Sequence, residues 1–252
     1  MTDYNRHLIT HANHPIAAPL ADERVDVLLD RALAHRPRGG RLLDLGCGQA
    51  AWPLRALATR PEATAVGVDL DQGGLDWAAA EAERTGVADR LRLVRGDAAA
   101  FAEGTFDAVL CVGATHAFGG LSATLEAARP LLAADGRLVV GEGFWERAPD
   151  RAALDELDAS PDDYADLAGT VRLATDAGWV PVHGHVSTLA EWDDYEWNWT
   201  GSLASWALDH PDHPHAPEAA TTAASHRDGW LTAYRSTLGF LTLILRRSSA
   251  TA

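Results

Sequence analysis

Short apolar runs alternate with amphipathic stretches over the first 145 residues of the chain. Residues 20–35 have helical spacing, with Val25, Leu28, Leu29 and Leu33 on one face. Runs of strand length follow, and segments of helical length separate several of them. The predicted strands are 41–46, 64–70, 91–97, 106–114 and 137–145, and the further predicted helices are 51–60, 73–86 and 121–134. This order predicts an α/β fold with a parallel, doubly wound sheet.

The regular alternation of predicted strands and helices ends after residue 150. Residues 151–178 are predicted to be helical, and 180–188 to form a sixth strand. A tryptophan-rich helical stretch follows, is interrupted near 210–217, and continues as a second helix to about residue 235. A last strand is predicted at 237–247. Two strands joined by about 50 residues are unusual for a plain dinucleotide-binding fold.

Composition narrows the classes of partner. The 252 residues are 47% hydrophobic, which suits one α/β domain. With 36 acidic and 21 basic residues the formal charge is −15, so we expect neither nucleic acid nor a membrane surface as a partner. All basic residues are arginine. The absence of lysine excludes a Schiff-base lysine, a pyridoxal-phosphate lysine and a P-loop lysine.

Cysteine usage and the chain start point to a cytoplasmic protein. Cys47 and Cys111 are too few and too far apart for a disulfide framework or a zinc site. The first 15 residues lack the basic and apolar regions of a signal peptide, and the apolar runs are far shorter than a membrane span. The sequence leaves the oligomeric state open.

The stretch "LLDLGCGQA" at 42–50 predicts a ligand-binding turn between a strand and a helix. Gly46 and Gly48 permit backbone angles closed to other residues and leave room for a ligand. The helix that follows offers free N–H groups. Asp44, at the end of the strand, does not suit a pyrophosphate but suits a cationic group.

Two further acids end the next strands. Asp69 follows Gly48 by 21 residues, where a carboxylate can accept hydrogen bonds from both hydroxyls of a ribose. Asp97 ends the third strand, where its carboxylate can accept from the exocyclic amine of adenine while Ala98 donates its backbone N–H to a ring nitrogen. Together the acids describe an adenosine with a cationic tail, and S-adenosylmethionine fits this description.

The sequence motifs resemble those of class I S-adenosylmethionine-dependent methyltransferases. The segments are "LLDLGCGQAAWPLRAL", "AVGVDLD", "RGDAAAF", "FDAVLCVGATHAF" and "LLAADGRLVVGE", in the family's order and spacing from about residue 40 to 145. The resemblance implies a seven-stranded sheet in which the antiparallel strand 237–247 lies between the fifth and sixth strands. It places Asp44 and Gly46 near the methionine part, Asp69 at the ribose and Asp97 at the adenine. The predicted cofactor contacts are completed by Cys47, Gly48, Gln49, Leu70, Ala98 and Cys111.

The same resemblance predicts how the chain is divided. Residues 1–252 form a single methyltransferase domain. Within it, 1–38 are an N-terminal leader and helix, 39–188 the cofactor-binding core, 189–235 a helical substrate cover, and 236–247 the final strand.

The candidates for catalysis follow the fourth and fifth strands. His116 comes after the fourth strand, whose end faces the transferred methyl group in this fold, and an imidazole there can take a proton from the acceptor. Glu142 can orient a substrate amine or act as a base, and Trp145, close behind it, is a candidate substrate contact. The alternatives to these catalytic roles are that His116 is only a polar loop residue and that Glu142 makes only a structural hydrogen bond.

Two segments are candidates for contact with the acceptor. His11 and His14 lie in a segment similar to the leader that folds over the pocket in some small-molecule members of the family, and a plain flexible terminus is the alternative. The stretch "EWDDYEWNWTG" at 191–201 carries Tyr195, Trp197 and Trp199 among four acids. Aromatic rings with acids predict a lid for a neutral or cationic small molecule, and a helix that only packs on the domain is the alternative.

No metal site is predicted. Three histidines and an aspartate in "HPDHPH" at 210–215 could hold a divalent ion, but its two prolines and exposed character favour a plain loop. His183 and His185 share one strand face and are weaker candidates still.

The predicted function is methyl transfer from S-adenosylmethionine to a small-molecule acceptor, at oxygen, nitrogen or carbon. An NAD-dependent oxidoreductase would use the same glycine turn and Asp69, but it leaves Asp44, Asp97 and the antiparallel last strand unexplained. A non-catalytic, regulatory protein that binds S-adenosylmethionine is the second alternative.

Overall fold

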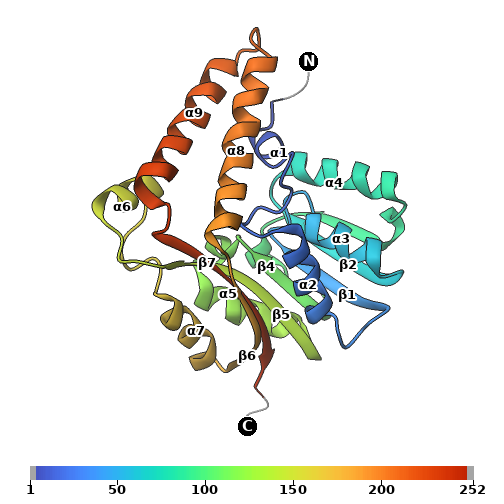
Figure 1. Cartoon of the computed structure of the whole chain (residues 1–252). Helices are drawn as coiled ribbons and strands as arrows, with labels where there is room; N and C mark the ends of the chain where they lie inside the picture. Colours follow the sequence, from blue (N-terminus) through green and yellow to red (C-terminus); the bar gives the residue numbers. More distant parts are fainter. Residues whose placement is uncertain (1–3, 249–252) are drawn as a thin grey trace.

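The computed structural model describes residues 4–248, so the first residues of the predicted leader (1–3) and the last four of the predicted domain (249–252) lie outside the described residues. One seven-stranded sheet forms the centre, in the order β3-β2-β1-β4-β5-β7-β6 (Figure 1). The strands are β1 (Gly39–Leu45), β2 (Glu62–Asp69), β3 (Leu91–Arg95), β4 (Phe106–Val112), β5 (Leu132–Trp145), β6 (Trp179–Val186) and β7 (Leu238–Arg247).

The direction of the strands confirms the predicted fold class. Strands β1 to β5 pair in parallel, and β7 runs antiparallel between β5 and β6. Every residue of β4 except Asp107 is buried, because helices cover both faces of a parallel sheet. The order reverses between β1 and β4, so the crevice at the carboxyl ends of these two strands is where this kind of sheet binds its ligands.

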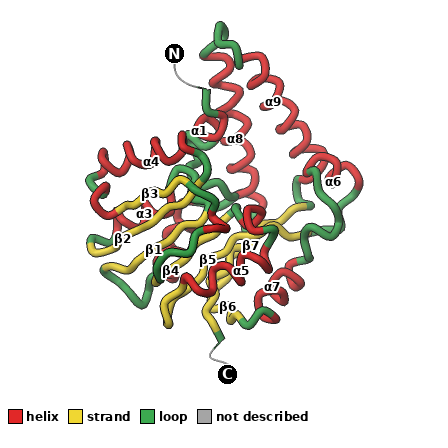
Figure 2. The backbone as a smooth tube through the Cα atoms, turned by 180° about the vertical axis from the view of Figure 1, so that it is seen from behind, coloured by secondary structure: helices red, strands yellow, loops and turns green. Residues whose placement is uncertain are grey.

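Two helical layers enclose the sheet. On one face, α2 (Asp22–Ala32) and α3 (Ala51–Thr59) contribute Leu28, Leu29 and Leu57 to an apolar cluster, with α4 (Gln72–Thr85) alongside. On the other face, α5 (Leu121–Ala128) and α7 (Leu167–Asp176) pack on the second cluster, as the view from behind shows (Figure 2).

The structure corrects several predicted boundaries. The predicted helix 151–178 is divided into α6 (Arg151–Leu157) and α7, because a turn at Ser160, closed by hydrogen bonds to Asp163, separates them. The predicted helix 121–134 ends early, and β5 begins at Leu132. The leader contains a short helix, α1 (Arg6–Thr10), which the sequence did not predict.

The link between β6 and β7 forms a helical hairpin that extends beyond the sheet (Figure 1). It consists of α8 (Leu189–Asp209) and α9 (Ala216–Gly229), and a π-helical turn (Trp230–Tyr234) leads from α9 to β7. A capping box between Thr188 and Glu191 starts α8. Helix α1 packs against α8, so the leader and the hairpin meet beside the carboxyl ends of the strands. None of the helices within residues 4–248 is both long and apolar enough to cross a membrane.

Candidate functional site

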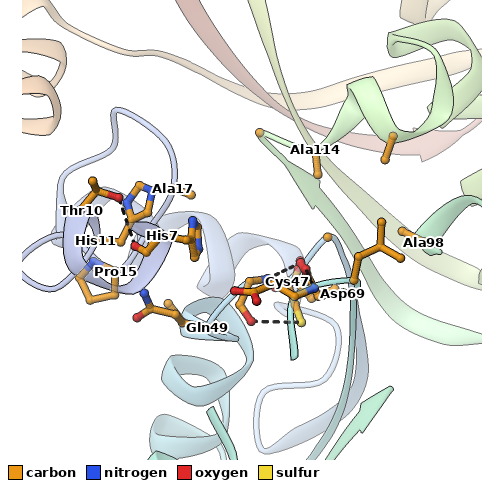
Figure 3. Close-up of a pocket in the computed structure, with 18 of the residues that line it drawn as sticks. His7, Thr10, His11, Pro15, Ala17, Cys47, Gln49, Asp69, Ala98 and Ala114 are labelled. Atoms are coloured by element: carbon orange, nitrogen blue, oxygen red, sulfur yellow. Dashed lines mark hydrogen bonds between the residues drawn. The ribbon is translucent and has the colours of Figure 1, made fainter. Parts of the chain in front are cut away.

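A cavity of about 960 Å³ lies between the leader, the carboxyl ends of β1, β2 and β4, and helix α8. Figure 3 shows leader residues such as His7, His11 and Pro15 facing the turn that follows β1. Nine of the ten predicted cofactor contacts line this cavity: Asp44, Gly46, Cys47, Gly48, Gln49, Asp69, Leu70, Asp97 and Ala98.

The two glycines of the turn are required by space as well as by backbone angle. Gly46 has φ +78°, and a Cβ there would lie 2.4 Å from the Cβ of Ala114. Gly48 has φ +52°, and a Cβ there would lie 3.1 Å from Nε2 of His7. A side chain at either position would be strained or crowded, so the turn stays open toward the cavity.

Asp69 organises the loops beneath the cavity. One carboxylate oxygen accepts the backbone N–H of Gly48 at 2.7 Å, and the other accepts that of Asp71 at 2.8 Å. A carboxylate has about four lone-pair positions. Asp69 therefore retains the capacity to accept from two further donors, as the two hydroxyls of a ribose would require.

Asp44 and Gln49 both line the cavity, and each has a buried polar atom that is unpaired. Oδ2 of Asp44 and Nε2 of Gln49 are buried without a hydrogen-bond partner in the described part of the chain. Burial, and secondarily the charge of Asp69, raise the pKa of Asp44 to about 8. Because an unpaired buried group is costly, this pair fits a ligand that carries both an ammonium and a carboxylate. A methionine tail has both groups.

The other end of the cavity suits a flat base. Leu70 is 67% exposed, an unusual state for a leucine that lines a cavity. Ala98 is buried beside it, and Asp97 accepts the backbone N–H of Ala99 at 2.9 Å. An apolar side chain next to backbone and carboxylate groups fits an adenine, so the cavity as a whole fits S-adenosylmethionine.

Cys111 is the exception among the predicted cofactor contacts. It is fully buried in the apolar cluster beneath the cavity and is not among the lining residues, so the structure corrects this prediction. Burial raises the pKa of the thiol. Cys47 does line the cavity, and its Sγ would lie 2.8 Å from a Cβ added to Gly67, which shows how tightly the turn packs on β2.

Of the two predicted catalytic residues, His116 lines the cavity and Glu142 does not. One carboxylate oxygen of Glu142 accepts the backbone N–H of Gly143 at 2.9 Å, and Thr115 donates to the same side chain. Burial raises the pKa of Glu142. The structure thus gives Glu142 the structural hydrogen bond that was its alternative role.

Trp145 also lies outside the cavity. Its Nε1 donates to the carbonyl of Pro161 at 2.9 Å, and its ring meets Tyr164 edge-on. It borders a separate, shallow groove with Asp166 and Leu167. The predicted contact of Trp145 with the acceptor is therefore corrected.

The leader places His11 on the cavity wall and His14 behind it. Nδ1 of His11 lies 3.3 Å from the carbonyl of His14, and Nδ1 of His14 lies 2.8 Å from that of Ile16. Burial, followed by the neighbouring His7, lowers the pKa of His11 to about 4, so its ring is neutral at neutral pH. Tyr195 packs against both imidazoles and supports the wall without lining it.

Only one aromatic residue of the predicted lid borders the cavity. Trp199 lines it, and its indole stacks on His226 with ring centroids 4.1 Å apart. Trp197 is 52% exposed and meets Trp230 edge-on, so the structure corrects its predicted contact with the acceptor. The difference arises because residues two apart on a helix point in different directions.

Three of the four acids in the stretch 191–201 of α8 already have partners. The pairs are Glu191 with His185, Asp193 with Arg235, and Glu196 with both His226 and Tyr234. The acids therefore join α8 to β6, to α9 and to the segment that leads into β7. This partnering removes the reason to expect a cationic acceptor.

Several lining residues were not predicted from the sequence. They are Tyr4, Asn5, Arg6, His7, Thr10, Pro15, Ala17, Ala51, Trp52, Asp71, Gly96, Val112, Gly113, Ala114, Ala117 and Glu218. The first seven belong to the leader, whose helix α1 is only five residues long. Such a short helix has no recognisable periodicity. The one available signal was Asn5, a helix-capping residue type placed three positions before Leu8.

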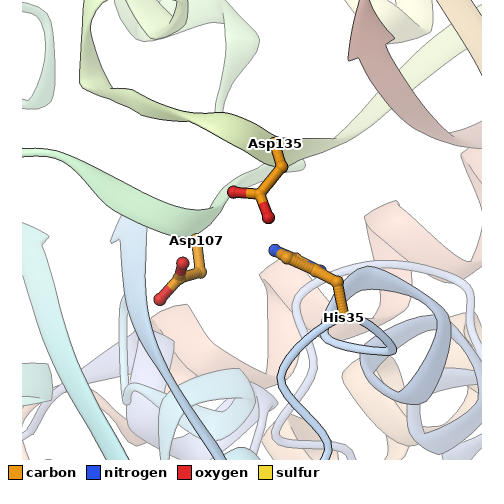
Figure 4. Close-up of side chains that lie close together, drawn as sticks. All are labelled: His35, Asp107 and Asp135. Atoms are coloured by element: carbon orange, nitrogen blue, oxygen red, sulfur yellow. The ribbon is translucent and has the colours of Figure 1, made fainter.

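A separate cluster lies at the opposite end of the sheet, where His35, Asp107 and Asp135 approach one another (Figure 4). Arg36 pairs with both carboxylates, at 3.1 Å and 3.2 Å, and Asp107 also accepts the backbone N–H of Arg41. The guanidinium of Arg36 therefore already contacts an oxygen of each carboxylate and offsets one of the two negative charges.

The histidines at 210–215 pack as aromatic rings. His215 stacks on Tyr4 with centroids 4.5 Å apart, and His210 stacks on Trp206 at 4.9 Å. These contacts join the tip of the hairpin to the leader. His185 is held by Glu191, whereas Nε2 of His183 is buried without a hydrogen-bond partner in the described residues.

Comparison with known proteins agrees with the geometry. A family model described as a methyltransferase domain matches residues 43–140. The uncharacterized protein YjhP of Escherichia coli (strain K12) is 30% identical over 216 residues, which cover 83% of this chain and 85% of that protein.

Solved structures extend the similarity to nearly the whole chain. An S-adenosylmethionine-dependent methyltransferase from Geobacter sulfurreducens, in complex with S-adenosyl-L-homocysteine, has a TM-score of 0.87 and 27% identity, and the match covers 98% of this chain and 100% of that one. The corresponding enzyme from Thiobacillus denitrificans, with the same ligand, has a TM-score of 0.86 and 26% identity at the same coverage. None of these relatives supports an NAD-dependent oxidoreductase.

Proposed function

The chain belongs to the class I S-adenosylmethionine-dependent methyltransferases, and we propose that its methyl acceptor is a small molecule. When bound, S-adenosylmethionine supplies a methyl group on a positively charged sulfur. Transfer from such a sulfur is an in-line displacement, in which the enzyme mainly aligns the reactants and excludes water. The shape of the cavity is the observation that supports a small acceptor.

The cavity is covered on the side where the acceptor would enter. Leader residues Pro15 and Ala17 line it, and the carbonyl of Ala17 lies 2.7 Å from where a Cβ on Gly113 would be. Trp199 on α8 closes the far side. A cover that presses this closely on the loop after β4 suits a molecule of limited size better than a protein or nucleic-acid chain.

Three lining residues have proposed roles toward the acceptor. His116 follows β4 and is exposed to the cavity, so it is the proposed proton acceptor. His11 is neutral, and its Nδ1 faces the carbonyl of His14, which favours a hydrogen on Nδ1 and a free lone pair on Nε2. His11 can therefore accept a hydrogen bond from a hydroxyl or amine, while Trp199 contributes an apolar wall.

The size of the acceptor can be tested with radiolabelled S-adenosylmethionine. A cell extract is separated by ultrafiltration into low-mass and macromolecular fractions, and each is incubated with the enzyme. We expect label to appear in low-mass products only. Transfer of label to protein or nucleic acid would contradict the proposal, and boiled enzyme serves as the control.

Once an acceptor is in hand, the two tryptophans of α8 form a matched pair. Replacing Trp199 with alanine should raise the Michaelis constant of the acceptor by about 5-fold to 10-fold, because a half-buried aromatic ring that lines the cavity is lost. Trp197→Ala should change it less than about 2-fold, since Trp197 faces outward. Steady-state kinetics at saturating cofactor measures both values. Equal effects of the two substitutions would show that α8 contributes only packing.

A further inference from the structure

The carboxylate of the cofactor's methionine tail needs hydrogen-bond donors, and the chain contains no lysine. Asp44 can meet the ammonium group of the tail, but it is an acceptor and would repel the carboxylate. Near this end, the lining residues with polar N–H groups to offer are Gln49 and, from the leader, Arg6 and His7. Side-chain donors to the carboxylate are therefore sought in Gln49 and in the leader.

His7 stands directly over the turn. Its Nε2 lies 3.1 Å from the position that a Cβ on Gly48 would occupy. The ring is therefore next to the residue that precedes Gln49 (Figure 3). Within residues 4–248, neither ring nitrogen of His7 has a hydrogen-bond partner. The next residue of the turn, Gln49, has a buried Nε2 that is also unpaired. His7 and Gln49 thus both line the cavity, and each has a side-chain nitrogen without a partner in the described residues.

The leader holds His7 in this place. Asn5 caps α1 by accepting the backbone N–H of Leu8 at 3.1 Å, and its amide donates to Asp71 at 3.4 Å. The hydroxyl of Thr10 donates to the carbonyl of His7 at 3.1 Å. Helix α1 is therefore anchored to the loop after β2, and the ring of His7 is positioned before any ligand arrives.

We propose that His7 and Gln49 together bind the carboxylate of the methionine tail, so that the leader is part of the cofactor site as well as a cover for the acceptor. Arg6, the competing donor, is exposed to solvent, whereas His7 is half-buried over Gly48. Burial lowers the pKa of His7, and Asp71 and Asp69 raise it. A neutral imidazole still donates through one ring nitrogen, so the role does not depend on its charge.

Two ligands that differ in the tail separate this role from any other. S-adenosylhomocysteine carries the ammonium and the carboxylate, whereas 5′-methylthioadenosine has the same nucleoside and sulfur without them. We expect His7→Ala to weaken the binding of S-adenosylhomocysteine by about 10-fold, as for a lost hydrogen bond to a charged group. The binding of 5′-methylthioadenosine should weaken by less than about 2-fold. Isothermal titration calorimetry of the full-length protein measures both.

Matched variants sharpen the result. His7→Gln keeps an N–H donor and should restore part of the lost affinity, and Gln49→Ala should show the same selectivity for the ligand with the tail. Arg6→Ala removes a donor from the same helix and should change the affinities for the two ligands by about the same factor. Thermal unfolding of each variant without ligand checks that α1 remains folded.

Three outcomes would overturn the proposal. Equal weakening of both ligands by His7→Ala would mean that His7 acts on the nucleoside. Unchanged binding would remove it from the site, and selective loss in Arg6→Ala alone would assign the carboxylate to Arg6. Failure of the unmodified protein to bind S-adenosylhomocysteine is a separate result, since that would refute the cofactor itself.

Discussion

Replacing Asp69 with alanine is expected to weaken the binding of S-adenosylhomocysteine by about 100-fold, because two ribose hydroxyls lose a charged acceptor. The loss has a second source. Asp69 also accepts the N–H groups of Gly48 and Asp71, and their release would loosen the turn itself. We therefore expect the free energy of unfolding of the protein without ligand to fall by about 1–3 kcal/mol. Calorimetry and urea unfolding measure the two effects.

Asparagine at the same position separates these two sources. Asp69→Asn keeps one carbonyl oxygen, so it can preserve one of the two backbone hydrogen bonds while losing the charge. Its stability should be closer to that of the unmodified protein, whereas its affinity should remain at least about 10-fold lower. A variant series in which affinity tracks stability alone would show that Asp69 shapes the turn without meeting the ribose.

Replacing Asp44 with asparagine is expected to change binding and stability in opposite directions. Binding of S-adenosylhomocysteine should weaken by about 30-fold, because the ammonium of the tail loses a charged partner. The protein without ligand should become more stable at pH 8.5, by a few kcal/mol, because asparagine carries no charge into a fully buried position.

The pH dependence of stability tests the cause. Burial, with a smaller effect of Asp69, raises the pKa of Asp44 from 3.8 to about 8. Between these values the folded state binds more protons than the unfolded state, so this group's contribution to stability is lost as the pH rises toward 8. Asp44→Asn should remove that slope. Urea unfolding at several pH values between 5 and 9 measures it, and parallel slopes in the two proteins would contradict the assignment.

Ligand binding should also depend on the protonation of Asp44. A cationic ligand favours the ionised form of Asp44, so binding near pH 7 should release a proton from this residue. Calorimetry in buffers of different ionisation enthalpy counts the protons. The difference between the unmodified protein and Asp44→Asn isolates the contribution of Asp44 from that of the ligand's own amino group.

The cofactor half of the site could be predicted from the sequence because its residues have fixed places relative to the strands. Asp44 and Asp69 lie at the carboxyl ends of β1 and β2, and Asp97 comes just after β3; a parallel sheet brings such ends together at one edge. The glycines between β1 and α3 are local requirements of backbone angle. The antiparallel last strand followed in the same way, from the resemblance of the motifs to a family with that topology.

The acceptor half was predicted less well, because it depends on which way side chains point. Trp197 and Trp199 are equivalent in composition, yet only Trp199 lines the cavity, and only the packing of α8 against α9 decides this. Nothing in the sequence indicates partners for the acids of α8, but Arg235 and His226, about 30 to 40 residues away, pair with two of them. Cys111 lies on a strand that is buried on both faces, so it reaches the core instead of the ligand.

The sequence by itself determined the fold class, the cofactor and the turn that receives it, since these follow from hydrophobic period, glycine geometry and the order of motifs along the chain. The resemblance of its segment to a family leader had already predicted His11 as a contact over the pocket, whereas only the tertiary structure placed His7 on a wall of the same cavity. A helix as short as α1 is held mainly by tertiary contacts, with Asp71 and with α8, because it is far below the length at which a helix is stable alone. Its position is a result of packing between segments distant in sequence, and no local pattern encodes it.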